Sequence, residues 1–170
     1  MSDVQLWRYT LPSIKGSGWA IFVLGSDGYF SSVSDFGRYA FMWGAHGCKD
    51  FREFLFGAEK DPDYFIGKLS PGEEYDGVAT KKAILDRLLE MKKNGDLDRK
   101  AYVAEVNALK DYDIENYSGE GFREWVGHSD TKIRDSYELS CTRHPRNVER
   151  FVKEAMVRLI PLLKADLASV

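Results

Sequence analysis

The chain has 170 residues, of which 44% are hydrophobic and 14% aromatic, and its formal net charge is −3. This length and composition predict one folded domain over residues 1–170 and exclude a largely disordered chain. A charge so close to neutral gives no overall attraction to nucleic acid or to an anionic membrane. No apolar run approaches the roughly 18–20 residues that a transmembrane helix needs.

The first 45 residues carry the pattern of a β-meander. Residues 4–11 alternate in the manner of a strand, and residues 19–24 are apolar on both faces, which predicts a central strand covered on both sides. Gly25-Ser26-Asp27-Gly28 predicts a hairpin turn, because Asp-Gly accepts the positive φ values of tight turns. Residues 29–34 and 38–43 follow as partner strands.

From residue 46 onward the hydrophobic period changes to about 3.6, which predicts helices. Residues 51–58 predict a short helix, and residues 136–140 predict a brief strand. Three aspartates stand where helix N-caps are expected: Asp61, Asp76 and Asp98. Pro145 opens the last helix, and Pro161 inside that helix is expected to bend or stop it.

Strands followed by helices predict an α+β fold. We expect an N-terminal antiparallel β-meander of three or four strands, mainly within residues 1–45. We expect residues 46–170 to be mainly helical and to pack on one face of the sheet.

Both cysteines stand close to a histidine. His46 and Cys48 form one pair, and Cys141 and His144 form the other. Thiolate and imidazole are zinc ligands, so the two pairs predict a tetrahedral zinc site if they meet in the fold. The alternative is a chance spacing, with Cys48 a small buried residue and His46 a loop residue.

Catalytic signatures are few. Cys48, just before a predicted helix, can act as a nucleophile if one of the three histidines serves as its base. There is no G-x-S-x-G elbow and no phosphate-binding glycine loop. We therefore expect a non-catalytic protein without a cofactor, and zinc is the alternative.

Two acidic clusters and one basic group are candidate contact surfaces. The acidic residues are Glu73, Glu74 and Asp76, and then Asp111, Asp113 and Glu115. They can bind a partner or a divalent cation, and the alternative is a solvated loop with a helix cap. Arg143 and Arg146 can contact a phosphate, or form a solvated helix start.

Aromatic residues concentrate on the predicted sheet, and Tyr39 and Trp43 are candidate partner contacts among them. On an exposed sheet face such rings can stack on bases. Under covering helices they are core residues, which the number of predicted helices favours.

Four segments carry a resemblance to a set of small proteins encoded by bacteriophages and prophages. They are WAIFVLGSDGYF (19–30), VSDFGRYA (33–40), KDFREFL (49–55) and RHPRNVERFV (143–152). The resemblance implies a setting, the cytoplasm of an infected or lysogenic bacterium, and transfers no catalytic residue. The two cysteines and the lack of a signal-peptide pattern agree with a reducing cytoplasm.

This expected setting gives an order to the candidate functions. The leading hypothesis is a non-catalytic module that binds a bacterial protein or complex and inhibits or redirects it, with an anti-CRISPR or other anti-defence factor as its specific form. The second is a nucleic-acid-binding accessory protein that uses Arg38, Arg143 and Arg146. The third is a small zinc protein or enzyme built on the His/Cys pairs.

Overall fold

The computed structural model describes residues 3–14, 16–128, 133 and 135–169. The chain forms two compact units. Unit 1 comprises Met1–Gly72 with His144–Val170, and unit 2 comprises Glu73–Arg143. Each unit contains its own cluster of buried hydrophobic side chains. The single domain over residues 1–170 stays a prediction.

Unit 1 contains the β-meander. Its strands are β1 (Leu6–Leu11), β2 (Ala20–Gly25), β3 (Tyr29–Ser34) and β4 (Gly37–Met42). Each strand pairs antiparallel with the next, in the order β1-β2-β3-β4. The predicted meander and the α+β fold class are therefore confirmed.

The turn between β2 and β3 depends on Gly28. This glycine has φ +92°, and its N–H donates to the Gly25 carbonyl at 3.0 Å. A Cβ atom on Gly28 would lie 2.2 Å from the carbonyl oxygen of Trp43. The predicted hairpin is confirmed, and the chain needs glycine here for both its φ value and this close approach.

The helices of unit 1 come from two stretches of sequence. The first holds α1 (Phe51–Phe54), α2 (Gly57–Lys60) and α3 (Pro62–Leu69), so the predicted helix over 51–58 is two short helices. Asp61 caps α3 as predicted, because its side chain accepts from the Tyr64 N–H at 3.2 Å.

The second stretch is helical throughout residues 146–167. It consists of α7 (Arg146–Arg150), the π-helical segment η3 (Phe151–Met156) and α8 (Val157–Leu167), with Pro145 at the N-cap. Pro161 does not stop the helix. It is exposed, while Leu159, Ile160 and Leu163 on the same helix are buried, and their burial offsets the lost backbone hydrogen bond.

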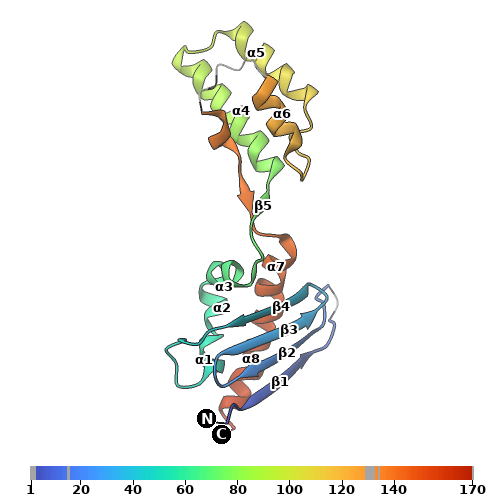
Figure 1. The fold of residues 1–170 in the computed structure, drawn as a ribbon, viewed down its shortest axis with the longest axis vertical. Helices are drawn as coiled ribbons and strands as arrows, with labels where there is room; N and C mark the ends of the chain where they lie inside the picture. The colour runs from blue at the N-terminus through green and yellow to red at the C-terminus, as the bar shows by residue number, and fades with distance from the viewer. Residues whose placement is uncertain (1–2, 15, 129–132, 134, 170) are drawn as a thin grey trace. The chain divides into compact units, whose positions relative to one another are not determined.

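The helices of unit 1 cover one face of the sheet. Phe151 stacks on Tyr39 with 4.2 Å between ring centroids and on Phe22 with 5.8 Å. The prediction that β2 is covered on both sides is wrong, because Ile21 and Val23 on its other face are only half-buried. Figure 1 shows β1–β4 unobstructed on the side toward the viewer, with α8 behind them.

Unit 2 is mostly helical. It contains β5 (Glu74–Tyr75), α4 (Gly77–Asn94), α5 (Arg99–Ala108), the 3₁₀ helix η1 (Leu109–Asp111), α6 (Glu120–His128), the 3₁₀ helix η2 (Ser136–Leu139) and β6 (Thr142–Arg143). Asp76 and Asp98 cap α4 and α5 as predicted.

The predicted strand over 136–140 is wrong. Local hydrogen bonds from Glu138 N–H to the Asp135 carbonyl and from Ser140 N–H to the Tyr137 carbonyl close 3₁₀ turns there. The strand follows two residues later as β6, where β5 supplies an antiparallel partner. None of the described helices combines the length and the apolar character needed to span a membrane.

Candidate functional site

One face of the sheet, which no helix of unit 1 covers, carries exposed apolar side chains. We call it the open face and define it by its residues. They are Leu6, Arg8, Thr10, Trp19, Ile21, Val23, Tyr29, Ser31, Val33, Arg38, Ala40 and Met42. Strand alternation places them together, because every second residue of a strand points to the same side.

Strand register arranges these side chains in rows across the sheet. One row runs Thr10–Ile21–Val33–Arg38, and the next runs Arg8–Val23–Ser31–Ala40. Five large apolar side chains of the face are exposed: Leu6 (63%), Met42 (51%), Val33 (43%), Trp19 (37%) and Tyr29 (37%). The open face is therefore apolar at its centre and has one arginine on each edge strand.

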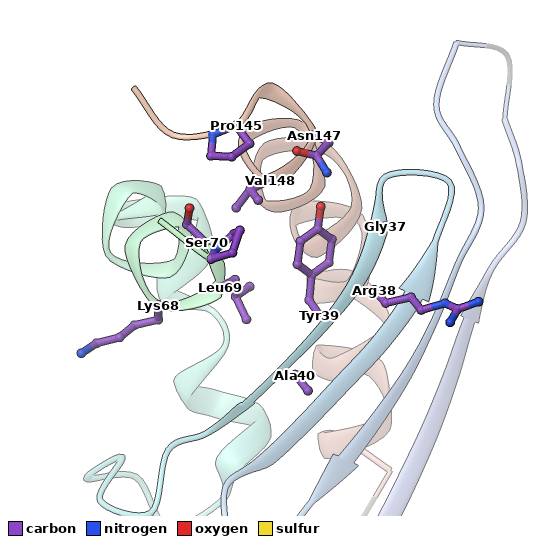
Figure 2. Close-up of a pocket in the computed structure, with 11 residues that line it drawn as sticks. Gly37, Arg38, Tyr39, Ala40, Lys68, Leu69, Ser70, Pro145, Asn147 and Val148 are labelled. Carbon is purple, nitrogen blue, oxygen red and sulfur yellow. The ribbon is translucent and has the colours of Figure 1, made fainter. Parts of the chain in front are cut away.

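The two arginines of the open face, Arg8 and Arg38, are exposed. Neither Arg8 nor Arg38 forms an ion pair with a carboxylate in the described part of the chain, and the open face as defined includes no Asp or Glu. Figure 2 shows the Arg38 side chain directed away from the cleft beside β4, which Tyr39 lines.

That cleft has a volume of about 460 Å³ and lies within unit 1. Residues 37–40 of β4, residues 68–71 at the end of α3, and Pro145, Asn147 and Val148 at the start of α7 line it (Figure 2). The Tyr39 hydroxyl donates to the Phe36 carbonyl at 2.7 Å, and Asn147 Nδ2 donates to the same oxygen at 3.1 Å. These two polar side chains therefore hold the β3–β4 turn against α7.

Tyr39 and Trp43, which the sequence offered as partner contacts, belong to the core. Their exposed fractions are 7% and 5%. Burial raises the pKa of the Tyr39 hydroxyl above its ordinary value. Trp43 packs edge-on against Phe30, and its Nε1 donates to the Tyr64 hydroxyl at 3.1 Å.

The predicted zinc ligands fall in both units. His46 and Cys48 lie in unit 1, where the Cys48 N–H donates to His46 Nδ1 at 3.4 Å. Cys141 lies in unit 2 and its N–H donates to the Thr80 hydroxyl at 2.9 Å, while His144 begins the second stretch of unit 1. Among the described residues, no three His, Cys, Asp or Glu side chains form a group that could hold a metal ion. The zinc site stays a prediction.

Four predicted contact residues come together at the β5–β6 ribbon of unit 2. Arg143 donates to the Glu74 carboxylate at 3.2 Å and lies 3.7 Å from that of Asp76. Glu73 accepts a hydrogen bond from the Thr142 hydroxyl. Their charges are thus largely engaged within the unit.

The second acidic cluster is an exposed loop. Asp111, Asp113 and Glu115 line a hollow of about 380 Å³ together with Lys81 and Lys110. Glu115 accepts from Lys81 Nζ at 2.7 Å. Arg146 is exposed at the start of α7 in unit 1, away in sequence from this loop.

A family model described as a phage family matches residues 2–165. The chain belongs to this phage family. No curated protein and no solved structure matches it. The resemblance noted in the sequence is therefore confirmed over nearly the whole length of this phage protein.

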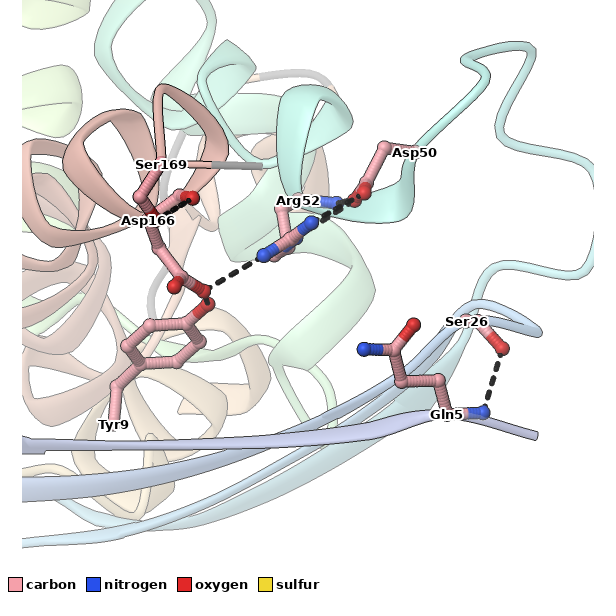
Figure 3. Close-up of polar contacts among 7 residues, drawn as sticks. All are labelled: Gln5, Tyr9, Ser26, Asp50, Arg52, Asp166 and Ser169. Atoms are coloured by element: carbon pink, nitrogen blue, oxygen red, sulfur yellow. Dashed lines mark hydrogen bonds and ion pairs between the residues drawn. The ribbon is translucent and has the colours of Figure 1, made fainter.

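Sequence reasoning missed one polar network of the phage protein, which surrounds the buried Arg52 (Figure 3). Arg52 is 4% exposed, and its guanidinium makes ion pairs of 2.7 Å with Asp50 and with the half-buried Asp166 of α8. Tyr9 of β1 donates to Asp166 at 2.5 Å. The Arg52 guanidinium also lies 4.3 Å from the centroid of the Trp7 ring.

The network shifts the pKa values of its members. Burial, with the hydrogen bond to Asp166, raises the pKa of Tyr9 to about 12. The hydrogen bonds from Arg52 lower the pKa of Asp50, and those from Tyr9 and Arg52 lower the pKa of Asp166. These groups join β1, α1 and α8, so the network stabilises the covered side of the sheet. Asp166 lies 114 residues from Arg52 in the sequence, and no local sequence pattern indicates that two such distant residues form an ion pair.

Proposed function

We propose that this phage protein is a non-catalytic module that binds a protein of the bacterial host through the open face. The observation that carries the proposal is an uncovered sheet face on which apolar residues stand where polar ones are expected. An antiparallel sheet with one solvated face usually alternates apolar-in and polar-out. Here β2 presents Ile21 and Val23 outward, beside exposed Val33 and Met42.

The composition of the face supports a protein partner. Large contiguous exposed apolar patches, especially ones rimmed by polar residues, mark interaction sites. Trp, Tyr, Met and Arg are enriched in interfaces, and Trp19, Tyr29, Met42, Arg8 and Arg38 all lie here. Aromatic and arginine side chains also supply most of the residues that dominate binding energy.

The phage family supports the specific form of the proposal. Phages infect hosts that carry defence systems, and a tightly bound module can block such a system without chemistry. We propose that the module inhibits or redirects its host protein, as an anti-CRISPR or other anti-defence factor does.

Nucleic acid is the second candidate occupant, because Trp19 and Tyr29 share the face with Arg8 and Arg38. Stacked rings beside cations are typical of single-strand binding. The aliphatic side chains between them favour protein instead, since they offer bases no hydrogen bonds. Binding of a labelled single-stranded oligonucleotide, steeply weakened by added salt, would favour nucleic acid.

A charge placed on the open face tests the proposal. Val33→Glu puts a carboxylate at the apolar centre, and Val103→Glu is the matched control, since Val33 is 43% exposed on β3 and Val103 is 47% exposed on α5 of unit 2. We expect affinity capture from host lysate to recover a stoichiometric host protein with the wild type and with Val103→Glu. We expect at least about a ten-fold loss with Val33→Glu, because it replaces an apolar contact with a charge that must be desolvated in the interface even when Arg38, its cross-strand neighbour, pairs with it. Equal capture by the two variants, both shown to be folded, would refute the assignment.

A further inference from the structure

We infer that the open face is shaped for an amphipathic helix whose apolar stripe is flanked on both sides by carboxylates. This inference rests on the proposed function, because it names the element with which a host protein would occupy the same face. A second copy of this chain and a nucleic acid are the competing occupants.

The two arginines of the open face indicate which charges a bound partner carries. Arg8 lies on β1 and Arg38 on β4, which are the two edge strands, and Ile21, Val23 and Val33 lie on the middle strands. Both arginines lack a carboxylate partner within the described chain. A partner that supplies one carboxylate at each edge therefore completes two ion pairs, whereas a partner with lysines there is repelled.

The spacing of the strands sets the shape of the occupant. Three strand spacings of about 4.8 Å place β1 and β4 about 14 Å apart. An α-helix with its side chains is about 10–12 Å wide, so it fits over the middle strands with its flanks beside the arginines. A second sheet across the whole face would cover both guanidinium groups and remove them from water, whereas a helix over the middle strands leaves their ion pairs at the solvent edge, where desolvation costs less.

The same sheet already packs against a helix on its other side. Residues 146–167 cover that face, with Phe151 stacked on Tyr39 at 4.2 Å between centroids. A partner helix on the open face would cover the second apolar face of the sheet as residues 146–167 cover the first.

Designed peptides are the direct probe. Two fluorescein-labelled helices of about five turns, roughly 18 residues at 3.6 per turn, share one leucine stripe. One carries glutamate on both flanks of the stripe, and the other carries lysine at those positions. By fluorescence anisotropy at low salt, we expect the full-length protein to bind the glutamate peptide about ten-fold or more tightly than the lysine peptide.

Charge reversal on the protein is the decisive comparison. We expect the double variant Arg8→Glu/Arg38→Glu to prefer the lysine peptide, and the control Lys60→Glu/Lys153→Glu, at exposed positions outside the face, to keep the wild-type preference. Thermal melts followed by circular dichroism establish that both variants fold. A folded charge-reversed variant that keeps the glutamate preference, or a wild type without any preference, overturns the inference.

Two further outcomes separate this inference from the proposed function. A dimer in sedimentation experiments that Val33→Glu dissociates, or oligonucleotide binding that Val33→Glu abolishes, shows another occupant and overturns the helix. If host-protein capture depends on Val33 but the peptides show no preference, the helix is wrong and the proposed function stands. If capture does not depend on Val33, the proposed function itself fails.

Discussion

Arg52 shows how one residue can hold distant parts of unit 1 together. Its guanidinium reaches Asp50 two residues away and Asp166 at the other end of the chain, and it lies over Trp7. A buried cation is tolerable only with such partners, because removing it from water costs several kcal/mol. The network therefore serves the fold, and it leaves the open face free of its charges.

Replacing this cation tests its structural role. Arg52→Met keeps an unbranched side chain over Trp7 but removes both ion pairs, so we expect a loss of about 2 kcal/mol in the free energy of unfolding at neutral pH. The control Arg150→Met removes an exposed ion pair with Glu154 and a cation–π contact 5.0 Å from the Phe36 ring centroid, and we expect it to change the free energy of unfolding much less. Urea denaturation of the three proteins measures both differences.

The pH dependence of that loss follows from the lowered pKa values of Asp50 and Asp166. A carboxyl with a lowered folded-state pKa stabilises the protein above its unfolded pKa of about 4, and this contribution disappears as pH falls through the folded-state pKa. The difference between wild type and Arg52→Met should therefore shrink from pH 7 to pH 3. A difference that stays constant over this range would show that the ion pairs do not cause it.

The β2–β3 hairpin is the element whose geometry most depends on a single position. In Gly28→Ala, the new Cβ atom is strained by the positive φ and also clashes with the Trp43 carbonyl oxygen. In the control Gly47→Ala, the φ of 73° gives strain, but no atom lies within 4 Å of the new Cβ atom. We expect the control to cost about 1 kcal/mol from backbone strain and Gly28→Ala to cost about 2 kcal/mol or more. Denaturation midpoints of the two variants measure these losses of stability. Equal losses would mean that the chain relieves the clash with the Trp43 carbonyl oxygen without a loss of stability.

The helix caps and the β2–β3 turn were predictable because the residues that determine them lie close together in the sequence. The caps Asp61, Asp76 and Asp98 and the turn at Gly28 depend on neighbours within a few residues. The pairing of β5 with β6 joins residues about seventy positions apart, and no local signal specifies it. Alternation in β2 located the two faces of the strand but could not tell which face a distant helix covers, so Ile21 and Val23 were expected to be buried.

Across the whole molecule, the acidic and basic residues singled out as candidate contacts fall into two groups: some form ion pairs within their own unit, and others are exposed without such a pair in the described part of the chain. Glu74 and Asp76 both lie within ion-pair distance of Arg143 in unit 2, and their role as partner contacts stays a prediction. Arg38, which the sequence offered as a nucleic-acid contact, lies on the open face of unit 1. Under the proposed function, a host protein is the occupant of that face.

The most direct test of the central claim is a photo-crosslink from the middle of the open face. Ser31 lies between Val23 and Ala40 in the register of the sheet, and p-benzoylphenylalanine at this position reaches whatever covers the face. In host cells we expect a covalent adduct with a host protein from position 31 and none from the same residue at position 103 in unit 2. A folded protein that gives no adduct from position 31, or the same adducts from both positions, would show that the open face does not bind a host protein.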